Sequence, residues 1–326
     1  MDRMNLVFRK YILLWAFLAM VVGYLAGRFN PKRVESLQVL ITPLLFTMIF
    51  IMVFPTSLST LRNLKYYTMP MLVSFFLTVL SPLGGLLVAR IIPQQFLFMR
   101  TGIVISTTVP PSAMLSAWTS FLDGDVLLTL IIQSFTFVVY LLLIPFGLKL
   151  LLVNSSNFSI LILIKNLLLL IVIPYILAGG IKMVFRRYLT RDLLTRLKPT
   201  LSSVSGIIEI LVILISIALR AEIITQYPVI IWWGVLTAAL FYALAFIVAF
   251  YITRLCNFER ETSIPLIYQN GTKNLPIAMV IALSSFGGRT ILGVAACILA
   301  QFPISALFYN LLSRQGALVP RAESDR

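Results

Sequence analysis

Apolar residues occur in long, nearly uninterrupted runs along this chain. A membrane-spanning helix needs about 20 such residues, and suitable runs lie at 11–27, 37–55, 66–89, 97–121, 126–153, 158–181, 199–219, 228–252, 262–287 and 290–313. These runs are apolar on all sides and rich in Leu, Ile and Ala, whereas the strands of a membrane barrel alternate polar and apolar residues. The pattern predicts an all-α membrane protein with ten transmembrane helices.

The overall composition supports this prediction. Hydrophobic residues make up 60% of the chain, charged residues 11%, and the mean hydropathy is +1.00. A water-soluble domain would need far more charge on its surface. The basic start Met1–Lys10 also fits a cleaved signal peptide, but the run that follows is long and the repeat described below uses it as a helix. Leu318–Arg321 spells a protease site often placed in expression vectors, so no function is assigned to the tail at 317–326.

The net charge of +15 is first sorted by membrane side, because Lys and Arg gather in cytoplasmic loops. With an inside N-terminus the inner set has sixteen members: Arg3, Arg9, Lys10, Arg62, Lys65, Lys182, Arg186, Arg187, Arg191, Arg196, Lys198, Arg254, Arg260, Arg314, Arg321 and Arg326. The outer set has nine: Arg28, Lys32, Arg33, Arg90, Arg100, Lys149, Lys165, Arg220 and Arg289. We therefore expect a multi-pass protein of the cell inner (plasma) membrane with both termini cytoplasmic, a basic loop at 182–198, and no nucleic-acid partner.

The sequence offers no catalytic or metal-binding cluster. It contains no His, and its two cysteines, Cys256 and Cys297, are far apart. The commonest general base and the usual metal ligands are therefore missing. Asp123-Gly-Asp125 is interpreted as a helix-capping turn. A membrane-embedded enzyme or receptor would need a catalytic cluster or a sizeable soluble domain, so we expect a protein that is not an enzyme and has no cofactor.

An internal repeat relates the two halves of the chain. Residues 111–121 align with residues 276–286 at an offset of 165, and six of the eleven positions agree. This offset carries the fourth helix onto the ninth, so each unit holds five helices, at 1–157 and 158–316. Because five is odd, the second unit enters the membrane inverted. Inverted repeats of this kind are characteristic of secondary transporters, which bind substrate where discontinuous helices meet.

Both aligned segments carry helix-breaking residues in mid-span. Pro110-Pro111 removes two backbone donors from the fourth helix, and Asn270-Gly271 with Pro276 flanks the middle of the ninth. Ordinary proline kinks are one interpretation. Equivalent breaks in both halves, each among polar residues, favour a cavity at the midplane instead. The predicted substrate-binding residues are Pro111, Ser112, Ser116, Asn270, Asn274 and Pro276.

These segments resemble motifs of one transporter family. Val109–Asp125 is similar to the Pro-Gly-Gly…Gly-Asn segment of the bile acid:sodium symporter superfamily, and Gly271–Phe286 to its Glu-Thr-Gly-x-Gln-Asn-x-x-Leu segment. Met48–Leu61 is similar to the arsenite-permease branch. The chain is identified as a divergent prokaryotic member. The resemblance implies broken, crossing helices 4 and 9 in a core domain, with helices 1, 2, 6 and 7 forming a panel.

The resemblance also places the family's sodium ligands on this sequence. Those of the first site fall on Leu115, Ser116, Thr129 and Gln133, so three of the four remain polar. The acidic ligand shared by both sites falls near Gln269, a neighbouring glutamine on Lys273 and a further glutamine near Leu77, while Asn274 is retained. A neutral amide at Gln269 removes the negative charge that would offset a bound cation.

Lys273 is a basic residue placed in the middle of a predicted span, 262–287. A charge at mid-membrane costs roughly 2.5–3.5 kcal/mol on insertion scales and normally has a polar partner. Backbone carbonyls of the broken helix, Gln133 and Glu209 are the candidate partners. One hypothesis is that the ammonium stands where relatives bind sodium. The other is that Lys273 snorkels to the interface from a helix end.

Together these features predict a secondary active transporter that moves a small organic anion by alternating access. Half-helix N-termini and Lys273 favour a negatively charged solute. The coupling residues are Lys273, Gln269, Ser116, Thr129, Gln133 and Glu209, with protons favoured over sodium. A sodium-coupled symporter, a metalloid efflux permease and a facilitative channel are the alternatives. The permease is disfavoured because arsenite calls for thiolates, and neither broken segment contains Cys. Membrane lipids and the solute are the expected partners.

Overall fold

The described residues of the computed structural model are helical. The structure describes residues 12–54, 67–112, 114–151, 161, 165, 169, 172–185, 191–226 and 228–318. Within them, four helices are long and apolar enough to cross a membrane: Thr68–Ala89, Val126–Pro145, Pro228–Leu255 and Gly288–Arg314. The described residues therefore form an all-helical membrane protein, as the apolar runs predict. The number of ten spans and the inverted symmetry remain predictions.

The helices of the first half follow the expected ranges, and the fourth span is divided in two. They are α2 (Ile12–Phe29), α3 (Pro31–Ser36), α4 (Gln38–Val53), α5 (Thr68–Ala89), the 3₁₀ turn η2 (Gln94–Phe96), α6 (Leu97–Thr107), α7 (Leu115–Phe121) and α8 (Val126–Leu151).

In the second half of the chain the ninth span is divided in two. Its helices are α10 (Ile173–Val184), α11 (Arg191–Ala218), α12 (Ala221–Gln226), α13 (Pro228–Leu255), α14 (Arg260–Gly271), α15 (Leu275–Ile281), the π-helical turn η4 (Ala282–Phe286), the 3₁₀ turn η5 (Gly288–Thr290) and α16 (Ile291–Leu318).

Two boundaries differ from the sequence prediction. The loop expected at 182–198 is wrong in its extent, because α10 continues to Val184 and α11 already begins at Arg191. The first residues of α11, 191–198, include charged residues, so a search for apolar runs does not detect them. Lys and Arg are nevertheless good helix formers, and the helix begins there. The short helices α3 and α12 were also not expected. Residues 158–160, 162–164, 166–168, 170 and 171 of the expected span 158–181, and the tail at 319–326, lie outside the described residues.

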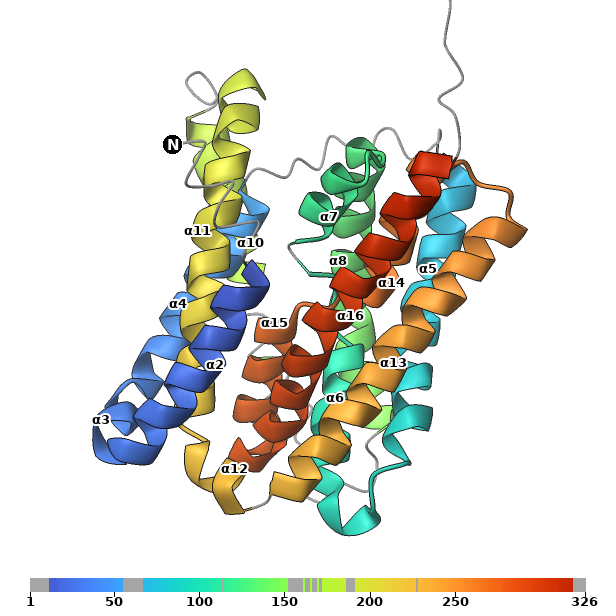
Figure 1. The fold of residues 1–326 in the computed structure, drawn as a ribbon. Coiled ribbons are helices and arrows are strands. Elements are labelled where there is room, and N and C mark those ends of the chain that lie inside the picture. The colour runs from blue at the N-terminus through green and yellow to red at the C-terminus, as the bar shows by residue number, and fades with distance from the viewer. Residues whose placement is uncertain are drawn as a thin grey trace, which may run out of the picture.

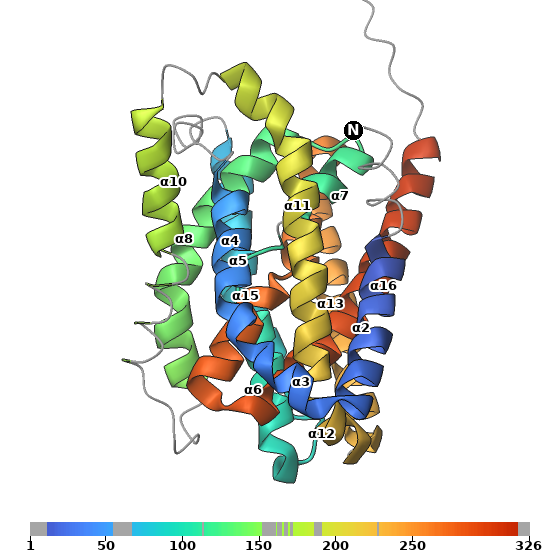
Figure 2. The same cartoon turned by 90° about the vertical axis from the view of Figure 1, so that its left-hand side faces the viewer.

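The helices form two groups that lie side by side in Figure 1, and Figure 2 looks onto the group that holds α2, α4, α10 and α11. In one group, α11 packs against α2 and α4, and α10 packs against α4. In the other, α13 packs against α5, α14 and α16, and α16 also packs against α6. Helix α15 contacts both α4 and α11. The second broken span therefore lies where the two groups meet.

Asp125 caps helix α8, as the turn chemistry predicts. Its Oδ1 accepts a hydrogen bond from the backbone N–H of Leu128 at 2.8 Å, and its Oδ2 accepts one from the Tyr67 hydroxyl at 2.8 Å. The carboxylate thus satisfies an amide that the first turn of a helix leaves free. It also ties the start of α5 to the start of α8. The capping interpretation of the Asp123–Asp125 turn is confirmed at Asp125.

Two glycines allow α6 and α16 to approach with their backbones in contact. A Cβ added to Gly102 would lie against the carbonyl oxygen of Thr290 and 2.8 Å from the Cα of Gly293. No side chain can occupy that space without moving one helix. Membrane helices commonly use small residues in this way, because close packing drives their association.

Replacing Gly102 by Ala is expected to lower the free energy of unfolding by about 1–3 kcal/mol, the usual cost of overpacking. The matched control is Gly84→Ala in α5, where the added Cβ would be 3.7 Å from the Phe241 ring, an ordinary contact distance. The control should be neutral or gain about 0.5–1 kcal/mol from the better helix propensity of Ala. Thermal unfolding in detergent would measure both. Equal unfolding temperatures for the two variants would contradict the packing argument.

Candidate functional site

The break in the fourth span follows from two consecutive prolines. Helix α6 ends at Thr107 and α7 begins at Leu115. Single prolines occur inside α4, α5, α8, α14 and α16, and these helices continue through them. Pro110-Pro111 instead removes two adjacent N–H groups, and each ring restricts the residue before it to extended conformations. The kink interpretation is therefore wrong for this span.

The break in the ninth span is shorter. Helix α14 ends at Gly271, and Thr272 is extended, with φ −129° and ψ 133°. Asn274 caps α15, its side-chain oxygen accepting from the N–H of Ile277 at 3.4 Å. Pro276 lies in the first turn of α15, where its missing N–H costs nothing. Lys273 lies in the connecting segment between the two half-helices.

The two breaks pair with each other. The N–H of Asn274 donates to the carbonyl oxygen of Pro110 at 2.8 Å, and the N–H of Ser112 donates to that of Thr272 at 3.4 Å. Pro111 and Lys273 form an isolated antiparallel bridge. Backbone groups released by one broken helix thus become partners for those of the other. This mutual pairing explains how irregular backbone is tolerated among buried residues.

Lys273 is completely enclosed at this crossing. Only 1% of its surface is exposed, so the interpretation that it snorkels to the interface is wrong. Its Nζ donates to the Tyr140 hydroxyl of α8 at 3.0 Å and lies 5.4 Å from the centre of that ring. The ring face offers a favourable cation–π contact. The ammonium is therefore held by one hydroxyl and one aromatic ring.

Gln301 of α16 holds the backbone of Lys273. Its Oε1 accepts from the Lys273 N–H at 2.7 Å, and its Nε2 donates to the Lys273 carbonyl oxygen at 3.1 Å. A side-chain amide that carries both a donor and an acceptor is suited to this two-bond contact. The contact fixes the connecting segment to α16 and orients the lysine side chain.

The partners proposed for Lys273 from the sequence are arranged differently. The Gln133 amide donates to the carbonyl oxygen of Ser112 at 3.3 Å, whereas the ammonium is bonded to Tyr140. The side chain of Glu209 lies outside the described part of the chain, although its backbone belongs to α11. The structure thus replaces the expected amide acceptor by a tyrosine hydroxyl.

Gln269 and Asn270 extend from α14 to opposite neighbours. Gln269 Nε2 donates to the carbonyl oxygen of Ser74 and to Thr78 Oγ1, both at 3.0 Å, on α5. Asn270 Nδ2 donates to the carbonyl oxygen of Ala245 on α13 at 2.8 Å. The side-chain oxygens of both residues are buried and have no hydrogen-bond partner in the described part of the chain. The two amides anchor the end of α14, just before the break, to α5 and to α13.

The residues carried over from the first sodium site lie along the interface between α7 and α8. The single hydroxyl hydrogen of Thr129 has two acceptors within reach, Thr119 Oγ1 at 3.1 Å and the carbonyl oxygen of Asp125 at 2.9 Å. Ser116 is half-buried on α7, and Leu115 is fully buried. Thr129, Gln133 and Tyr140 are spaced by one and two helical turns, so they lie on one face of α8. Of these residues, Gln133 and Tyr140 contact the crossing directly, through Ser112 and Lys273.

Sequence reasoning missed four residues of the site, Tyr140, Gln301, Ser74 and Thr78. Tyr140 donates to the carbonyl oxygen of Thr78 at 3.5 Å, which connects the Lys273 contact to the Gln269 contact. Its helical spacing from Gln133 was the available signal. Gln301 stands alone in an apolar run, where a buried amide normally has a specific partner. The spacing could have identified Tyr140 as a site residue from the sequence, and the isolated amide could have identified Gln301.

A comparison with known proteins finds a family whose model matches this chain. A family model described as Sodium Bile acid symporter family matches residues 42–227, more than half of the chain. That range includes α5 to α8 and ends before α13. An uncharacterized protein of Bacillus subtilis (strain 168), YbaS, is 24% identical over 263 residues, covering 79% of this chain and 83% of YbaS.

Proposed function

The chain belongs to the sodium bile acid symporter family, and from this premise we propose a secondary transporter of a small organic anion that needs no sodium. Membership makes the chain a membrane transport protein and not an enzyme. The solute, the alternating-access mechanism and the coupling are our proposal. The observation that carries it is the buried ammonium of Lys273 in the break of the ninth span, hydrogen-bonded to Tyr140.

An ammonium at this position disfavours a sodium ion nearby. Two unit charges about 4 Å apart repel by about 4 kcal/mol at an effective dielectric constant of 20. No Asp or Glu is among the buried polar side chains that the structure describes, so no carboxylate there would offset a second cation. Gln269, which stands where the family has an acid, is a neutral amide bonded to Ser74 and Thr78. Lys273 therefore serves as a built-in cation.

The same charge supports an anionic solute. Lys273 is the one charged residue among the described buried polar side chains. The half-helix N-termini of α7 and α15 add a weaker positive contribution. Their free amides are partly used within the protein, since Met114 N–H donates to Ser112 Oγ and Ile277 N–H to Asn274. The lysine is therefore the main source of the preference.

The positions of the helices support the proposal of two inverted repeats. The offset of 165 carries the start of α8, Val126, onto the start of α16, Ile291. It also carries the end of α6, Thr107, to the end of α14 within one residue. The two breaks thus occupy equivalent places in the two halves. Alternating access would move the group with α2, α4, α10 and α11 relative to the group that carries the crossing.

Sodium coupling is the second candidate, and unpaired oxygens favour it. Gln269 Oε1, Asn270 Oδ1 and Ser74 Oγ are buried without a hydrogen-bond partner in the described residues, and such oxygens are the ligands hard cations prefer. Gln269 and Asn270 point to different helices, however, since their amide nitrogens bond to α5 and to α13. They therefore do not form one coordination shell, and we place this candidate second.

The proposal predicts equal transport in sodium, potassium and choline media. A thermal-shift screen of small organic carboxylates on the purified protein supplies the solute, and its uptake is then followed in proteoliposomes. We expect initial rates in the three media to agree within about twofold, and an inward proton gradient to stimulate uptake. Uptake that requires sodium would reject the built-in cation and favour the second candidate. Uptake that is insensitive to every ion gradient and does not saturate would indicate a channel.

A further inference from the structure

A second basic site lies away from the crossing, at the end of the bundle where α13 ends and α14 begins. A cavity of about 560 Å³ opens there between these two helices and the last turns of α16. Its apolar lining consists of Phe250, Phe258, Ile264, Ile267 and Leu312. None of the residues placed at the crossing lines it. The cavity is therefore separate from the transport site.

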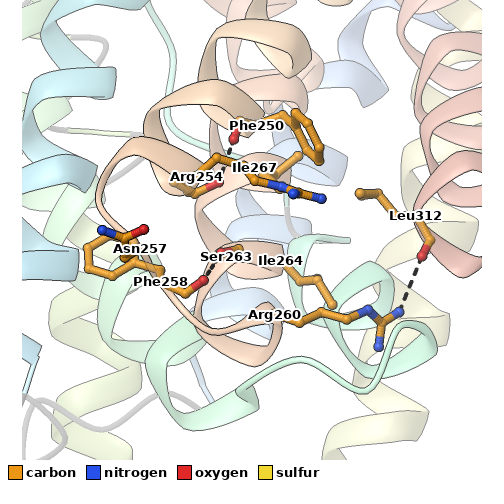
Figure 3. Close-up of a pocket in the computed structure, with 10 residues that line it drawn as sticks. Phe250, Arg254, Asn257, Phe258, Arg260, Ser263, Ile264, Ile267 and Leu312 are labelled. Atoms are coloured by element: carbon orange, nitrogen blue, oxygen red, sulfur yellow. Dashed lines mark hydrogen bonds between the residues drawn. The ribbon is translucent and has the colours of Figure 1, made fainter. Parts of the chain in front are cut away.

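Two arginines supply its charge, as Figure 3 shows. The Arg254 guanidinium lies 5.1 Å from the centre of the Phe250 ring, one helical turn earlier. Arg260 donates one hydrogen bond, at 3.4 Å, to the carbonyl oxygen of Leu312. Both guanidinium groups point toward Leu312 on α16. Two cations from different helices thus converge on one space.

Most donors of these arginines are free to bind a ligand. A guanidinium has five N–H donors, and Arg260 uses one of them in the contact with Leu312. Neither arginine forms an ion pair with a carboxylate in the part of the chain that the structure describes. Paired guanidinium groups with free donors are suited to phosphate, because their planar fork matches two oxygens of the anion.

The two helices α13 and α16 that line the cavity also carry exposed apolar side chains. On α13, Tyr251 is 62% and Leu255 80% exposed, and on α16, Leu307 is 51% and Leu311 47% exposed. In a membrane protein such side chains contact lipid tails. A small soluble phosphate would leave the apolar lining of the cavity in contact with water. A lipid would cover that lining with its glycerol and acyl groups. The combined chemistry is that of an amphiphile with an anionic head.

We propose that this cavity binds the phosphate of an anionic glycerophospholipid between Arg254 and Arg260, with an acyl chain along α13 and α16. Basic pockets between membrane helices bind acidic headgroups in this way. The lipid would join the start of α14, which leads to the Lys273 break, to the end of α16. The site does not depend on the solute or on the coupling ion.

Native mass spectrometry of the purified protein, titrated with phosphatidylglycerol and with phosphatidylethanolamine, tests the proposal. We expect one phosphatidylglycerol to be retained preferentially. Replacing Arg254 and Arg260 by Gln should weaken its binding about 10-fold to 30-fold, since each basic residue contributes about 1 kcal/mol. The control Arg28→Gln/Arg289→Gln removes the same charge from exposed residues at the opposite end of the bundle and should leave binding unchanged. Arg254→Gln alone should weaken binding by several-fold and leaves the Arg260 contact with α16 intact.

Three results would overturn this site. Equal retention of the zwitterionic and the anionic lipid would show that the headgroup charge is not recognised. If the Arg28→Gln/Arg289→Gln control lost as much phosphatidylglycerol binding as the Arg254→Gln/Arg260→Gln variant, the loss would be a general effect of surface charge. Displacement of the lipid by glycerol 3-phosphate at similar concentration would identify a soluble organic phosphate as the ligand instead.

Discussion

Replacing Lys273 by Met is expected to abolish the proton dependence of uptake and to leave the protein folded. Met keeps the length of the side chain but removes its charge and donors, and its thioether packs well against the Tyr140 ring. Coupling free energies of about 1–3 kcal/mol correspond to about 5-fold to 150-fold effects, so stimulation by a proton gradient should fall by that factor. Replacing a buried charge by an apolar residue is often neutral or stabilising. We therefore expect an unchanged or higher unfolding temperature.

Two further variants make this result specific. Lys32→Met makes the same substitution at an exposed position in α3 and should change neither uptake nor stability. Tyr140→Phe removes only the hydroxyl that accepts from the ammonium at 3.0 Å, and should alter the pH profile of uptake while uptake itself persists. Full proton dependence in Lys273→Met would show that this lysine is not the coupling group.

Replacing Gln301 by Leu is expected to give the largest loss of stability. The substitution leaves the N–H of Lys273, a residue that is 1% exposed, without a partner, and removes one of the two hydrogen bonds to its carbonyl oxygen, which keeps the one from the Leu275 N–H at 3.0 Å. An unpaired buried group costs about 1–3 kcal/mol and a lost hydrogen bond about 0.5–1.5 kcal/mol, so the free energy of unfolding should fall by about 1.5–4.5 kcal/mol. Transport should fall as well, because the segment that carries the lysine is no longer fixed to α16. Thermal unfolding in detergent and uptake in proteoliposomes measure the two effects.

Ser305→Ala provides the matched control for Gln301. Ser305 lies one turn further along α16, is equally buried, and donates to the carbonyl oxygen of Gln301 at 2.8 Å. Its loss removes a hydroxyl whose bond lies within one helix, so we expect a change below about 1 kcal/mol. If Gln301→Leu were as stable as Ser305→Ala, the two bonds to Lys273 would not hold the break in place.

The sequence by itself determined the fold class and the positions of the two breaks. Both follow from local chemistry. A run of about 20 apolar residues is sufficient for a membrane helix. Pro110-Pro111 breaks such a helix because two adjacent N–H groups are missing, and Asn270-Gly271 is a turn signal at the place where α14 ends. The family resemblance and the absence of a catalytic cluster can also be seen in the residues alone. The helix ends were predicted less well where charged residues begin a helix. Helix α11 begins at Arg191, several residues before the apolar run at 199–219.

Only the tertiary structure decided the partners of Lys273. Tyr140 precedes Lys273 by 133 residues and Gln301 follows it by 28. Neither separation along the chain predicts a contact. The sequence allowed two hypotheses for the Lys273 ammonium. In one it is exposed at the membrane interface, and in the other it is buried where the two broken helices cross. They differ only in how α8, α14 and α16 pack around the break. Local propensity determines where a helix starts and stops, but a buried charge must be satisfied by whichever groups packing brings within about 3 Å, and that is a property of the folded chain.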